Sequence, residues 1–151
     1  MSPRSASLPL KRALLAFWAL WFLVVFTTNV MDVLRISGLL NTNWPAVSDN
    51  YFLISKTTSV YRLPARWNTF FFFSIMSWQA ICVIVFLQAC IKLGKDAAGE
   101  CVYRAFGFGI GLFAAFILAC EVFINYELEA VHMRVFTAQL ASLLAVRLLP
   151  D

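Results

Sequence analysis

Charged residues are scarce in this sequence, and their scarcity excludes a water-soluble fold. Asp, Glu, Lys and Arg make up 13% of the 151 residues, whereas soluble domains usually carry about 25%. Hydrophobic residues make up 62% of the chain, and the mean hydropathy is +0.79. A soluble domain of this length could not bury so much apolar surface, so we expect an integral membrane protein.

Residues that build metal sites and disulfides are also few. The chain has one histidine, His132, and four cysteines, none of which forms a Cys-x-x-Cys pair. A zinc site or a disulfide framework needs such pairs or clusters. A single histidine cannot form a bis-histidine haem site. We therefore expect no cofactor and no metal.

The sequence contains no glycine-rich phosphate-binding loop and no recognisable catalytic residue. Its net charge of +4 comes from Lys and Arg at the ends of apolar segments, as in membrane proteins, and these residues form no basic stripe. That distribution excludes a nucleic-acid interface. The expected partners are membrane lipids and other membrane protein subunits.

Long apolar runs are what the sequence has in abundance. About 20 apolar residues cross a bilayer core of about 30 Å as a helix, and four segments fit this length: 13–31, 67–93, 103–126 and 129–149. The predicted fold is all-α, an integral membrane four-helix bundle that forms a single domain over residues 1–151. The segment 32–66 is the one long loop, and within it Tyr51 to Tyr61 is predicted as a short helix at the membrane surface.

The distribution of Lys and Arg predicts the orientation. Seven of these residues fall on the side of the two termini and five on the side of the long loop. Positive charge is enriched on the cytoplasmic side of membrane proteins. We therefore expect a bacterial inner-membrane protein with both termini in the cytoplasm and the loop outside.

Four polar residues in or next to the spans are predicted to lie in the bundle interior: Asn29, Asp32, Gln79 and Glu121. An ionisable side chain inside a span is costly and is a functional hypothesis by default. For Glu121 two interpretations stay open, a structural pair with Arg134 or His132 and a proton or cation site. Gln79 is expected to hydrogen-bond across helices.

Small residues recur every four positions in the third span, at Gly107, Gly111, Ala115 and Ala119. Such a face lets another helix approach closely. We expect these residues to pack inside the bundle, with a pathway or a dimer seam as the alternative. The phenylalanines on the opposite side of the same helix are then predicted to face lipid; they are Phe106, Phe113, Phe116 and Phe123.

Glu129 and His132 have the Glu-x-x-His spacing of diiron helix bundles, because residues three apart share a helix face. Those centres need the motif from two helices, and this chain has only one histidine. We therefore interpret His132 as a capping or ion-pairing residue at the membrane surface.

Three short motifs carry a resemblance to a known family. Asn29 and Asp32 stand near the end of the first span, Trp78 and Gln79 stand where the family has Trp-Glu, and residues 120–123 stand where it has Gly-Glu-Trp-Phe. On these motifs the chain resembles a bacterial family of predicted small integral membrane proteins, a domain of unknown function with four transmembrane helices. The resemblance covers nearly the whole chain and implies four spans, but no activity.

The function expected from these features is that of an accessory subunit without a catalytic site in a larger membrane complex, such as a respiratory or photosynthetic one. One alternative is a small transporter or ion-coupled carrier that uses Glu121. Another is a membrane enzyme with an outer-surface site at Glu127, Glu129 and His132.

Overall fold

The chain is helical throughout the part that its structure describes. A computed structural model describes residues 3–41, 43–94 and 98–150, and no strand occurs within these ranges. The elements are α1 (Pro3–Ile36), α2 (Asn50–Thr58), the 3-10 helix η1 (Ser59–Tyr61), α3 (Ala65–Lys92), α4 (Ala98–Val122) and α5 (Tyr126–Leu148). The all-α prediction is confirmed.

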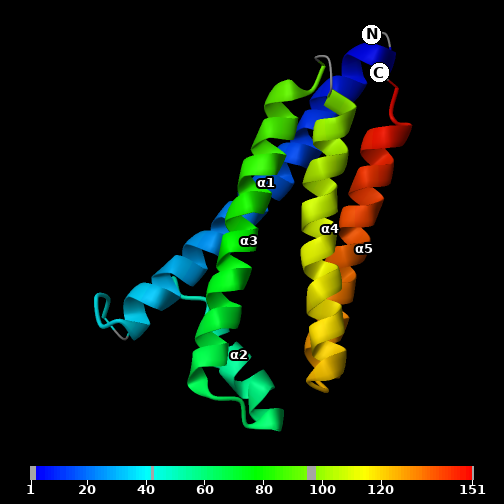
Figure 1. Ribbon diagram of the computed structural model, residues 1–151. Coiled ribbons are helices and arrows are strands. Elements are labelled where there is room, and N and C mark those ends of the chain that lie inside the picture. The colour runs from blue at the N-terminus through cyan, green and yellow to red at the C-terminus, as the bar shows by residue number, and fades with distance from the viewer. Residues whose placement is uncertain (1–2, 42, 95–97, 151) are drawn as a thin grey trace.

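The four long helices alternate in direction along the chain (Figure 1). As a result α1 begins and α5 ends at one end of the molecule, here called the terminal end, and α2 lies at the opposite end, the loop end. Helix α3 packs against both α1 and α4, and α4 packs against α5. Helix α1 is tilted, so that its C-terminal half moves away from α5 toward the loop end (Figure 1).

Three helices are long and apolar enough to cross a membrane: α1 from Ser7 to Ile36, α3 and α4. Helix α5 has 23 residues and would measure about 34 Å at 1.5 Å per residue. It falls outside this group because its composition is less apolar. The chain is therefore a helical protein with three candidate membrane spans.

The helix ends differ from the predicted ones where a polar side chain caps a helix. Helix α4 ends at Val122, and Tyr126, predicted to close that span, is instead the first residue of α5. The side chain of Asn125 accepts a hydrogen bond from the backbone N–H of Leu128 at 3.3 Å, which caps α5. Ile124 has a positive φ of 56° and reverses the chain direction between the two helices.

The predicted short helix in the long loop is confirmed as α2 followed by η1. The hydroxyl of Thr58 donates to Asn68 Oδ1 at 2.6 Å, which ties the end of α2 to α3. The Tyr61 hydroxyl donates to the Val122 carbonyl at 2.7 Å, and Asn125 Nδ2 donates to Thr57 Oγ1 at 3.0 Å. The loop is thus a folded segment fastened across the loop end.

Aromatic side chains fill the space between the helices, and two of them correct a prediction. Phe106 is fully buried and Phe113 is 4% exposed, so they do not face lipid. Phe106 packs edge-on against Phe86 of α3, with ring centroids 5.1 Å apart, and Phe86 stacks on Phe22 of α1 at 5.7 Å. The aromatic side of α4 therefore turns inward at Phe106 and Phe113.

Candidate functional site: a cavity at the loop end

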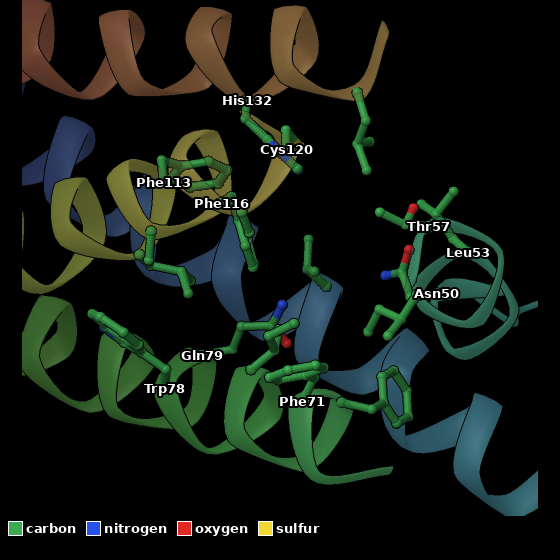
Figure 2. A pocket seen from close by; sticks show the side chains of 18 of the residues that line it. Asn50, Leu53, Thr57, Phe71, Trp78, Gln79, Phe113, Phe116, Cys120 and His132 are labelled. Atoms are coloured by element: carbon green, nitrogen blue, oxygen red, sulfur yellow. Dashed lines mark hydrogen bonds between the residues drawn. The ribbon is translucent and has the colours of Figure 1, made fainter. Parts of the chain in front are cut away.

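The described residues surround a cavity of about 500 Å³ in the loop-end half of the molecule. This volume lies in the range of small-molecule sites, about 300–1,000 Å³. All four long helices and α2 contribute to its wall (Figure 2). It forms where α1 moves away from α5, and α2 covers its outer end.

Small side chains on α4 leave room for the cavity. Ala115 and Ala119, predicted to pack against another helix, line it instead. Gly111 lies against Trp78, since an added Cβ would sit 3.5 Å from that ring. Gly107 does not pack at all, because nothing lies within 4 Å of where its Cβ would be. The predicted packing face is therefore wrong at Gly107, where α4 faces outward.

One wall carries three carboxamides in a continuous row, here called the amide chain: Asn50, Asn29 and Gln79. Asn50 Nδ2 donates to Asn29 Oδ1 at 2.8 Å, and Asn29 Nδ2 donates to Gln79 Oε1 at 2.8 Å. Asn29 is fully buried and Gln79 is 4% exposed. The amide chain connects α2, α1 and α3 and gives a largely apolar cavity one polar wall.

A buried acid next to the amide chain fixes α2 to α1. Asp32 is fully buried and accepts hydrogen bonds from the backbone N–H of Tyr51 at 3.0 Å, from Arg35 at 2.9 Å and from Ser48 at 3.5 Å. Arg35 also pairs with Asp49. A buried charge is tolerated only when it is paired and hydrogen-bonded, and these partners meet that need. Asp32 is therefore a structural anchor outside the cavity wall.

On the facing wall His132 stacks on Phe116, with ring centroids 4.7 Å apart and 30° between the planes. Its Nδ1 lies 3.5 Å from the sulfur of Cys120. The structure thus places His132 in the cavity wall (Figure 2), half-buried, and not in a surface cap or ion pair. The inward aromatic side of α4 brings it there, because Phe116 covers its ring.

Glu121 does not lie in the interior, contrary to the prediction. Its side chain is exposed, and it is absent from the cavity wall. Successive helix residues are turned by about 100°, so the inward position of Cys120 turns Glu121 outward. No ion pair joins Glu121 to Arg134 or His132 in the described part of the chain.

Glu127 and Glu129, the two acids of the predicted outer-surface site, do not form a metal-binding cluster with His132. Glu127 is exposed and Glu129 is half-buried at the start of α5. Across residues 3–41, 43–94 and 98–150, no group of three His, Cys, Asp or Glu side chains could hold a metal ion.

Sequence reasoning placed Asn29, Asp32 and Gln79 inside, and the structure buries all three. It missed Asn50, whose partner Asn29 is 21 positions away in the sequence. A lone asparagine at the start of a loop helix gives no signal of such a contact. It also missed Phe116, which was expected to face lipid although it lines the cavity.

A comparison with family models, with curated proteins and with solved structures finds no match. The case for a function therefore rests on the geometry of this chain.

Proposed function

We propose that this chain is a four-span protein of a bacterial inner membrane, with α5 as the fourth span and both termini in the cytoplasm. A length of about 34 Å suffices for α5 to cross. Two of its hydroxyls, on Thr137 and Ser142, donate to their own helix backbone at 2.8 Å each, which satisfies them without water. Arg147 near its end lies over the ring of Tyr103, 4.8 Å from the centroid.

Within this architecture we propose that the protein binds a lipid-soluble molecule in the cavity, as a non-catalytic accessory subunit of a larger membrane complex. The observation that carries the binding role is an apolar cavity of about 500 Å³ whose lining, as far as the structure describes it, includes no Asp, Glu, Lys or Arg. In a bilayer such a space is filled by an apolar chain.

The same wall argues against catalysis. Cys120 and His132 lie near each other, and a thiol beside an imidazole can act as a nucleophile. Acyl transfer also needs N–H donors for the oxyanion, and Cys120 lies inside α4, where the backbone N–H groups are engaged in the helix. Binding therefore has more support than the enzyme alternative. The carrier alternative loses its basis because Glu121 is exposed.

Filling the cavity tests the binding role. The full-length chain is purified in mild detergent, and co-purifying small molecules are quantified by native mass spectrometry. Ala119→Phe places a ring in the cavity and should remove the bound molecule. Gly107→Phe is the matched control, because the space outside Gly107 is open. The binding role would be refuted if both variants carried equal amounts of the co-purifying molecule, or if the unsubstituted protein carried none.

The accessory role has its own test. Cross-linking in native membranes, followed by purification, should recover a defined set of membrane proteins in fixed proportion to this chain. A single monodisperse chain with no companions would contradict it.

A further inference from the structure

The cavity also carries information about the kind of molecule it holds, an inference that rests on the binding role proposed above. We propose that the ligand is a neutral amphiphile, with an uncharged hydroxyl or carbonyl head that hydrogen-bonds to the open ends of the amide chain: a hydroxyl can pair with either end, and a carbonyl pairs with the donor end. Its apolar tail lies among the aromatic side chains of α3 and α4.

The hydrogen-bond count of the amide chain gives the first step. A carboxamide offers both donors and an acceptor, and a row of three such groups joined by two hydrogen bonds leaves one end of each kind. Here the open ends are Asn50 Oδ1 and Gln79 Nε2, which make no hydrogen bond to another described residue. If the nitrogen and oxygen of all three side-chain amides were exchanged, the open ends would be Asn50 Nδ2 and Gln79 Oε1, again one donor and one acceptor.

These open ends belong to the cavity wall. Asn50 and Gln79 both line it, and Figure 2 shows them reaching it from α2 and α3. Gln79 is 4% exposed as a whole, but its unpaired Nε2 is not fully buried and is reached from the cavity that Gln79 lines. When the cavity holds an apolar chain and no water, an unpaired polar group in its wall costs free energy. A ligand with a hydroxyl or carbonyl in this position would remove that cost.

The charges around the cavity give the second step. The described lining contains no charged side chain, so a phosphate or ammonium head would lie there without a counter-charge, at high cost. The nearby charged cluster of Asp32, Arg35 and Asp49 has two acids and one base. It therefore repels an anionic head and supplies no site for one.

The opposite wall gives the third step. His132, stacked on Phe116, is a second polar group across the cavity from the amide chain (Figure 2). A head with two carbonyls, such as a quinone, has an acceptor for each wall. A head with a single hydroxyl or ester, as in a diacylglycerol or an isoprenoid alcohol, engages the amide chain alone. All three share the neutral hydrogen-bonding head.

Binding of matched probes to the full-length protein tests the inference. Dioctanoylglycerol and dioctanoylphosphatidate carry the same tails and differ in the head. A benzoquinone with a ten-carbon tail tests the quinone head, and farnesol tests the isoprenoid alcohol. By native mass spectrometry we expect dioctanoylglycerol to bind about tenfold or more tightly than dioctanoylphosphatidate, the effect of about 1.4 kcal/mol.

Two variants tie this preference to the amide chain. Gln79→Leu should weaken binding of neutral probes about tenfold. Gln88→Leu on the same helix should not, because Gln88 is exposed and bonds to Arg104 outside the cavity. Asn50→Ala removes the other open end and should also weaken binding, which guards against misfolding of a single variant.

The outcomes separate this inference from the proposed function. If phosphatidate binds as tightly as diacylglycerol and Gln79→Leu changes nothing, while Ala119→Phe still abolishes binding, the head group inference is wrong and the cavity remains a binding site. If no probe binds and no molecule co-purifies, both are wrong.

Discussion

Gly109 of α4 lies next to Gln139 of α5. A Cβ on Gly109 would lie 2.4 Å from Gln139 Oε1 and 2.9 Å from Nε2, so a side chain at this position would have to displace the amide. Gln139 is fully buried, and neither of its amide atoms has a hydrogen-bond partner among the described residues.

Gly109→Ala should therefore lower the unfolding temperature of the detergent-solubilised protein, by an overpacking cost of about 1–3 kcal/mol. In a Gln139→Ala background the same change should cost almost nothing, since the shorter side chain leaves space. Gly107→Ala is the control and should be neutral. Equal effects of Gly109→Ala in both backgrounds would rule out the contact.

Asp32 supports a second expectation because three donors converge on it. Asp32→Asn should loosen α2 and raise backbone hydrogen exchange over residues 50–58 by about tenfold, the effect of losing a charged hydrogen bond. Asp49→Asn is the control. Asp49 is 65% exposed, and exposed ion pairs contribute little to stability, so this variant should leave exchange in α2 nearly unchanged. If Asp32→Asn raises exchange in α2 no more than Asp49→Asn does, Asp32 does not hold this helix.

Among the helices, α4 shows how far sequence reasoning reaches. Its apolar run predicted a long helix, and α4 is one. The inward face was assigned to the small residues, but the helix turns Phe106 and Phe113 inward and Gly107 outward. A repeat of small residues and a row of aromatics are both compatible with an interior, and only the width of the gap between neighbouring helices decides between them. That width is not encoded in α4 alone.

The loop end was less predictable for the same reason. The short helix in the loop could be anticipated from its composition, and the burial of Asn29 and Gln79 from their positions in apolar runs. The row that joins them to Asn50 depends on α2 folding back onto α1 and α3. The cavity likewise follows from the tilt of α1 (Figure 1), which no local pattern specifies.

The orientation of α4 can be checked by truncating two neighbouring phenylalanines. Phe106→Ala should destabilise the protein by about 3–5 kcal/mol, as for other fully buried phenylalanines. Phe108 is 37% exposed, so Phe108→Ala should cost less than about 1 kcal/mol. Chemical denaturation in mixed micelles measures both. The opposite order would mean that α4 presents its other face to the core.

For the whole molecule the alternating helices place the beginning of α1 and the end of α5 together (Figure 1). If α5 spans the membrane, Tyr126 and Leu148 lie on opposite sides of it. In a background with the four native cysteines replaced by alanine, an impermeant maleimide should label Ser37→Cys and Tyr126→Cys on intact cells. Glu100→Cys and Leu148→Cys should react only after permeabilisation. Labelling of both Tyr126→Cys and Leu148→Cys on intact cells would make α5 a surface helix.

Occupancy of the cavity by a neutral amphiphile is the claim on which the functional account depends. A diacylglycerol analogue with a photoreactive diazirine in its tail, activated in native membranes and mapped by peptide mass spectrometry, reports directly where the tail lies. We expect labels on the cavity residues Leu53, Ala115 and Ala119. Labelling no stronger there than at the outward-facing Leu118 and Leu144, which are 67% and 59% exposed, would contradict a ligand in the cavity.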